Sequence, residues 1–137
     1  MGRVSVHPFR DPARDSIANE YVATVDRRDP DELVTWYTDD ATFRFANQPP
    51  VVGKAAITAA LRECYGRIAS MRHERTGAWA DATSGAFEAI AHFTTPDGRT
   101  FALPAVSTMR LRDGRIHEFR FAMDATPILG AGGADSG

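Results

Sequence analysis

The chain has 137 residues, 43% of them hydrophobic, 25% charged and 9% aromatic, which is the size and composition of one globular domain with a substantial core. Its formal charge of -2 argues against a surface built to bind a polyanion, so we expect no nucleic-acid partner. The single cysteine, Cys64, excludes an intrachain disulfide, and the four histidines lack the spacings of zinc sites, so neither a metal nor another cofactor is expected.

Both ends of the chain are predicted to be flexible tails around one domain at 16–128. Residues 1–15 mix prolines with charges and residues 129–137 are glycine-rich, so neither end carries enough apolar surface to fold. Residues 1–15 contain no signal-peptide core, and no stretch approaches the roughly 20 apolar residues of a membrane span. The sequence therefore predicts a cytoplasmic protein with no membrane partner.

Three helices are predicted in the first half of the domain. The first begins with an N-cap at Ser16 and ends in charged residues before Pro30. Pro30 opens a second, short helix that includes Tyr37 on its apolar side and ends at residues 39–40. The third begins near Lys54. Its apolar side chains recur at helical spacing and predict one buried face: Ile57, Leu61, Cys64, Tyr65 and Ile68.

Alternating hydrophobicity, the pattern of strands, dominates the second half. The alternating segments are 41–46, 73–81, 86–95, 99–112 and 115–125. The last four are separated by the residues that turns require, which predicts an antiparallel meander. Helices followed by such a sheet predict an α+β fold with the helices collected on one face.

The sharpest local prediction is a two-residue hairpin turn at Asp113–Gly114. This turn pairs Arg112 with Arg115. Continued without a bulge, the same register places Ser107 opposite Arg120.

That register also divides the hairpin into two faces. Asp124 shares the face of Ser107, and the opposite face carries Val106, Phe119 and Phe121. A single bulge would invert this assignment beyond the bulge. Because neither face is wholly polar, we expect helices to cover one and a second subunit the other, which gives a homodimer through the sheet.

Four segments carry a resemblance to a known superfamily: YVATVDRRD, WYTDDATFRF, PPVVGKAAI and DGRIHEFRFAMDATPIL. In this order they resemble the nuclear transport factor 2-like superfamily, and within it the SnoaL-like polyketide cyclases and the ketosteroid isomerases. The resemblance implies a cone-shaped, curved antiparallel sheet wrapped around three N-terminal helices, with a deep cavity inside. This superfamily includes isomerases, cyclases, epoxide hydrolases, dehydratases and binding modules, so its fold alone does not select a reaction.

Position by position, the resemblance is closer to the SnoaL-like cyclases than to the isomerases. Tyr21 matches the isomerases' oxyanion-hole tyrosine, but Phe45 stands where they have the general-base aspartate. Asp124 matches the acid–base carboxylate of the SnoaL-like cyclases, and His73 matches a recurrent polar residue. The resemblance implies a cofactor-independent isomerase or cyclase of a small, mostly apolar polyketide-like or secondary-metabolite substrate. Asp124 would be its acid–base, His73 a relay and Tyr21 an oxyanion donor.

The local sequence leaves alternatives beside these roles. Apolar neighbours predict a desolvated Asp124 with a raised pKa, whereas a cap on the turn at Thr126 is the other interpretation. His73 is either a proton acceptor oriented by Asp124 or a surface-loop residue. Six further side chains are expected to bind the substrate: Trp36, Phe43, Phe45, Trp79, Ser107 and Arg120. A binding protein without turnover is the alternative function, as is an epoxide hydrolase-like or dehydratase variant.

Overall fold

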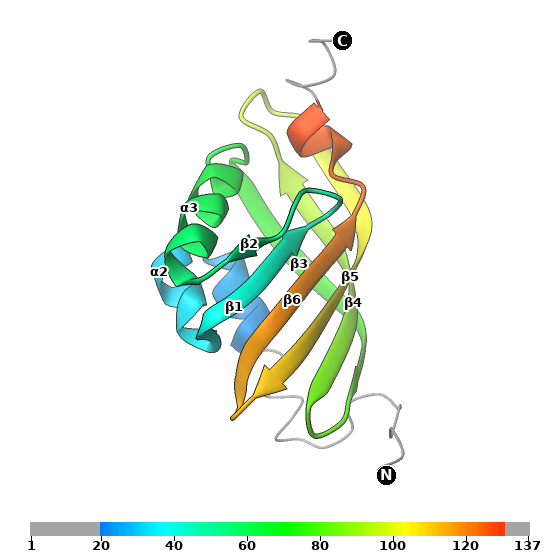
Figure 1. The fold of residues 1–137 in the computed structure, drawn as a ribbon. Helices are drawn as coiled ribbons and strands as arrows, with labels where there is room; N and C mark the ends of the chain where they lie inside the picture. The colour runs from blue at the N-terminus through cyan, green and yellow to red at the C-terminus, as the bar shows by residue number, and fades with distance from the viewer. Residues whose placement is uncertain (1–19, 131–137) are drawn as a thin grey trace.

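The computed structural model describes residues 20–130 (Figure 1). The first helix is described over residues 20–26, so its predicted N-cap at Ser16 lies outside the described residues, as do the tail at 1–15 and residues 131–137. The backbone of residues 129 and 130, predicted to belong to a tail, continues the last helical turn, η2 (Thr126–Gly130).

Three helical segments precede strand β3 (Ser70–Ala80), and the first two strands of the sheet lie between the second and the third segment. They are the helix at 20–26, the short pair α2 (Pro30–Leu33) and η1 (Val34–Trp36), and α3 (Lys54–Tyr65). The Asp29 carboxylate caps α2 by accepting hydrogen bonds from the N–H groups of the first turn. Tyr37, predicted to lie in this helix, instead begins strand β1. The predicted helix end at residues 39–40 was therefore wrong, because the aromatic and β-branched residues after Trp36 favour extended backbone.

Six strands form one curved, open sheet in the order β2-β1-β6-β5-β4-β3. Their bounds are β1 (Tyr37–Phe45), β2 (Val51–Val52), β3 (Ser70–Ala80), β4 (Ser84–Thr94), β5 (Thr100–Arg112) and β6 (Arg115–Met123). Neighbouring strands are antiparallel, except that β1 and β6 run parallel. Figure 1 shows the helices gathered on one side of this sheet, which confirms the predicted α+β architecture.

The predicted turn between β5 and β6 is confirmed. Asp113 and Gly114 have φ values of 53° and 79°, the left-handed pair that a type I′ turn needs. Arg112 pairs with Arg115 as expected.

A bulge beyond this turn overturns the predicted faces. Leu111 pairs with Ile116, but the register shifts before Arg110, which pairs with Glu118. From there on Ser107 lies opposite Phe121 instead of Arg120, so the bulge-free assignment was wrong.

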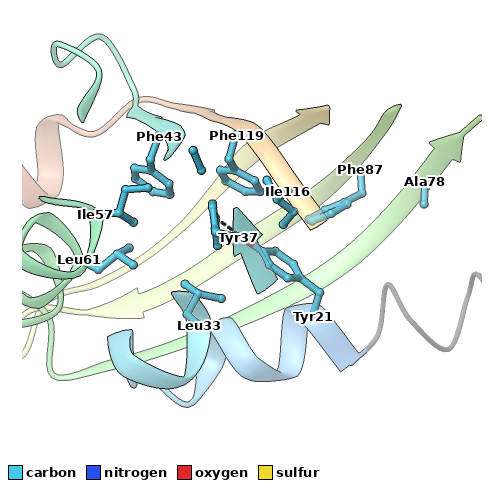
Figure 2. Close-up of a cluster of buried hydrophobic side chains, with 11 residues drawn as sticks. Tyr21, Leu33, Tyr37, Phe43, Ile57, Leu61, Ala78, Phe87, Ile116 and Phe119 are labelled. Carbon is cyan, nitrogen blue, oxygen red and sulfur yellow. Dashed lines mark hydrogen bonds between the residues drawn. The ribbon is translucent and has the colours of Figure 1, made fainter. Parts of the chain in front are cut away.

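The shifted register turns the aromatic side chains of β6 toward the helices. Phe119 joins a buried cluster with Tyr37, Leu33 and Ile57 (Figure 2). Val106, in contrast, points away from the helices and is 40% exposed. The side of the sheet that faces the helices is called the inner face below, and the other the outer face.

No helix in the described part of the chain is both long and apolar enough to cross a bilayer. Within residues 20–130, no three histidine, cysteine or acidic side chains gather in a way that could hold a metal ion.

Candidate functional site

A cavity of about 410 Å³ lies between the helices and the inner face of the sheet. Its wall is mostly apolar, and every strand contributes at least one side chain to it. The buried part of the wall includes Tyr21, Phe87, Ser107 and Phe119. Exposed residues from the β1–β2 loop and α3 lie at the rim: Gln48, Pro49, Pro50, Glu63 and Arg67.

The sheet curls tightly around this cavity. In sheet order β3 is three strand spacings from β6, which is about 14 Å in a flat sheet. Yet the imidazole of His73 on β3 lies edge-on to the ring of Phe121 on β6, with ring centroids 6.0 Å apart. The curvature therefore brings side chains of distant strands to the same small volume.

A carboxylate from the first helix holds His73 in place. Asp26 Oδ1 lies 2.7 Å from His73 Nδ1, and Asp26 Oδ2 accepts a 2.9 Å hydrogen bond from the backbone N–H of His73. The His73 side chain is only 9% exposed and that of Asp26 23%. Both oxygens of one carboxylate thus fix the ring and the backbone of the same residue.

This pairing determines which nitrogen of His73 can act. An ionised carboxylate only accepts hydrogen bonds, so Nδ1 carries the hydrogen that points to Asp26. In the neutral imidazole, Nε2 then holds the free lone pair. His73 lines the cavity, and no residue in the described range forms a hydrogen bond with Nε2. The arrangement leaves Nε2 free to accept a proton from a molecule in the cavity.

Asp26 is a candidate site residue that the sequence analysis missed. It lies 47 positions before His73, in a charged segment that reads as a solvated helix end. One signal was available: Asp26 is the last helical residue before a turn, and an acid is unfavourable beside the negative end of a helix dipole. An acid kept at such a place indicates a partner elsewhere in the fold.

Tyr21 occupies a buried part of the cavity wall, as its predicted role requires. Its hydroxyl is 2.8 Å from the hydroxyl of Tyr37, which is fully buried and does not line the cavity. Burial raises the pKa of Tyr21 well above the ordinary range, and the neighbouring phenol of Tyr37 adds to the shift. Tyr21 is therefore a protonated hydrogen-bonding group and not a base.

Three of the six expected substrate-binding residues line the cavity. They are Phe43 and Phe45 of β1 and Ser107 of β5. Ser107 is only 4% exposed, and no described residue forms a hydrogen bond with its hydroxyl. That these three residues bind a substrate stays a prediction.

The other three expected substrate-binding residues lie elsewhere, so their placement in the cavity was wrong. Trp36 packs edge-on against Tyr21 outside the cavity wall, with ring centroids 5.3 Å apart. Trp79 and Arg120 lie on the outer face, because the bulges in β3 and in the β5–β6 pair change their facing. Arg120 pairs there with Glu118 at 2.9 Å, not with an acid in the cavity.

Asp124 is the main correction to the predicted site. It is exposed, it does not line the cavity, and its Oδ1 accepts a 3.1 Å hydrogen bond from the N–H of Thr126. Hydrogen bonds from the side chain and backbone of Thr126 hold the pKa of Asp124 below its ordinary value. The expected desolvation and raised pKa were wrong, and the turn cap is the interpretation that the structure supports.

Comparisons with known proteins agree with this architecture. A family model described as a SnoaL-like domain matches residues 18–119. A comparison with curated proteins found no significant match.

Solved structures share the fold at low sequence identity. One is a protein with a ketosteroid isomerase-like fold from Catenulispora acidiphila, solved with trimethylamine. It has a TM-score of 0.74 and 19% identity, with 85% of this chain and 92% of that one covered. A candidate polyketide cyclase from Xanthomonas campestris has a TM-score of 0.73 and 18% identity, with 85% and 93% covered. A nuclear transport factor 2-like protein from Burkholderia pseudomallei has a TM-score of 0.75 and 18% identity, with 85% and 94% covered. Because the family model spans most of the folded domain and the fold agrees with it, this chain belongs to the SnoaL-like family.

Proposed function

We propose that the chain is a cofactor-independent acid–base enzyme, an isomerase or cyclase, in which His73 is the general base and Asp26 orients it. One observation carries the proposal: a histidine paired with a carboxylate at 2.7 Å lines an apolar cavity of about 410 Å³. An apolar wall with few polar groups is typical of sites for small, mostly apolar ligands. Similarity to a candidate polyketide cyclase supports a polyketide-like or other secondary-metabolite substrate.

The chemistry needs a group that takes a proton and returns it. Nε2 of His73 removes a proton from a carbon beside a carbonyl, and the electrons of the C–H bond move to the carbonyl oxygen as an enolate forms. Where a C=C bond of the substrate is conjugated with the enolate, returning the proton to the far carbon of that bond shifts the double bond and completes an isomerisation. If the enolate carbon instead attacks a second carbonyl, the new oxyanion takes up the proton and a ring closes.

The test uses 5-nitrobenzisoxazole, a small aromatic molecule with an acidic C–H. A base removes that proton, the ring N–O bond breaks, and a coloured nitrophenolate carrying a nitrile is released. The chain should accelerate this reaction above the rate in buffer, with saturation at high probe concentration. Binding of the probe without acceleration would favour the alternative, a binding protein without turnover.

The same assay separates His73 from the acid that the sequence favoured. We expect Asp124→Asn to keep kcat/KM within about twofold of the wild type, because Asp124 is exposed and caps a turn outside the cavity. A tenfold or larger loss in a variant of unchanged melting temperature would restore Asp124 to the site.

We further propose that a second copy of the chain covers the outer face and forms a homodimer. Val106 is 40% exposed there, between Glu88 and Ala122 on the neighbouring strands, and Ala86 and Ile90 flank Glu88 on the same face. An exposed apolar side chain in the middle of a sheet, with small and apolar side chains beside it, is a candidate contact, and pairing of two identical faces forms a closed assembly.

Sedimentation at micromolar concentration tests this dimer. We expect the wild type to sediment as a dimer and Val106→Lys to shift it toward monomer. Val52→Lys is the matched control, because Val52 is 62% exposed on the edge strand β2 and lies far from β5 in the sheet order. A monomeric wild type, or equal effects of both changes, would contradict the dimer.

A further inference from the structure

The residues of the cavity wall that carry a hydroxyl differ in their hydrogen bonds. The hydroxyl of Tyr21 already has Tyr37 as a partner at 2.8 Å. Ser107 and Tyr65 line the same cavity, and neither hydroxyl forms a hydrogen bond with any residue of the described chain. Tyr65 is the less expected of the two, because the sequence assigned it to the packing face of α3.

Tyr65 lies in the same cavity wall as His73. It is the last residue of α3 and packs against both buried clusters of the protein. Burial raises the pKa of its phenol, and the nearby Cys64 and Asp26 raise it further. Tyr65 in turn contributes to the raised pKa values of Tyr21 and Tyr37. Tyr65 therefore shares the cavity wall with His73 and Tyr21.

The hydroxyl of Tyr65 has no acceptor within the described protein. Both oxygens of Asp26 accept hydrogen bonds from His73, and neither accepts one from Tyr65. Burial raises the pKa of the Tyr65 phenol, so it keeps its hydrogen at neutral pH and can donate it to an acceptor. What it lacks is an acceptor, and the cavity is where one can bind.

We infer that the Tyr65 hydroxyl donates a hydrogen bond to an oxygen of the molecule bound in the cavity, and that this ligand is a ketone or a related carbonyl compound. The inference deepens the proposed function, since a carbonyl oxygen beside His73 is the atom that gains charge when a neighbouring C–H loses its proton. Its test measures binding alone and does not depend on turnover.

Two aromatic probes of nearly equal shape make the test. In 2-acetylnaphthalene a carbonyl oxygen is present, and in 2-isopropenylnaphthalene a CH2 group replaces it. Both dissociation constants are measured in the same buffer for the wild type and for each variant. The wild type should bind the ketone roughly 3- to 10-fold more tightly than the hydrocarbon, the usual worth of one hydrogen bond.

Tyr65→Phe should remove this preference by weakening ketone binding while leaving hydrocarbon binding within about twofold. Equal weakening of both probes would show that Tyr65 only packs against the ligand, and an unchanged preference would assign the hydrogen bond to another group. Either result overturns the inference, as does a wild type that binds both probes equally.

A second variant tests the role of the Tyr65 hydroxyl if Tyr65→Phe fails to fold. The double change Tyr21→Phe, Ser107→Ala removes the other two cavity hydroxyls. Retention of the ketone preference in this variant supports Tyr65, and its loss overturns the inference. If His73 variants leave proton transfer from 5-nitrobenzisoxazole unchanged while the ketone preference still depends on Tyr65, the proposed enzyme fails and the ligand class stands.

Discussion

His73→Gln should lower kcat/KM for 5-nitrobenzisoxazole by about 10²- to 10⁴-fold, the usual contribution of a positioned general base. Glutamine fills a similar space and keeps a polar group at the cavity wall, but it cannot take up a proton at neutral pH. The loss should fall mainly on kcat, because the apolar wall that binds the probe is unchanged.

Asp26→Asn tests the orienting half of the pair. An amide can turn its NH2 group toward Nδ1, which favours the imidazole tautomer whose hydrogen lies on Nε2. The lone pair then points away from the cavity, so the probe should be turned over about 10²- to 10⁴-fold more slowly with little change in KM. A loss confined to KM would instead assign Asp26 to the packing of the cavity.

His92→Gln is the matched control for both changes. His92 also pairs with a carboxylate, with its Nε2 3.1 Å from Glu74 Oε1, but it does not line the cavity. Its replacement should leave kcat/KM within about twofold. If His73→Gln is as active as His92→Gln, the base lies elsewhere and the proposed mechanism is wrong.

The parts of the fold that depend on residues close together in the sequence were predictable from the sequence. The Asp113–Gly114 turn follows from the backbone that these two residues tolerate, and α3 follows from its apolar spacing. The bulge between Arg110 and Leu111 was not predictable, because one extra residue changes neither composition nor alternation enough to be seen. Its consequence is large, since it exchanges Arg120 for Phe121 on the inner face.

The site depends on contacts that no local pattern encodes. His73 was identified, but its partner Asp26 comes from a helix 47 residues away and meets it only because the sheet curls around the helices. Asp124 shows the opposite error. Apolar neighbours in sequence suggested desolvation, yet the chain turns after β6, and Asp124 faces solvent while Met123 and Ile128 line the cavity.

The expected instability of Phe119→Ala follows from the same curled sheet. Phe119 is 5% exposed and lies against three aromatic rings, with centroid distances of 5.5 Å to Phe43, 5.8 Å to Tyr21 and 6.1 Å to Tyr37. Removing its ring leaves a void bounded by β-strands and helices that cannot close independently, so we expect a loss of about 3–5 kcal/mol in the free energy of unfolding, measured by urea denaturation.

Phe101→Ala is the control for Phe119→Ala, because it removes an aromatic ring of the same size from a less buried position. Phe101 is only half-buried and stacks mainly on Phe93, at 5.3 Å, near the start of β5. Since its ring is only partly withdrawn from water, truncation should cost clearly less than at Phe119. The two changes should also differ at the cavity, because Phe119 supports Tyr21 and Phe43 in its wall, whereas Phe101 does not line it. Equal losses of stability would mean that the stack around Phe119 does not hold the helices against the sheet.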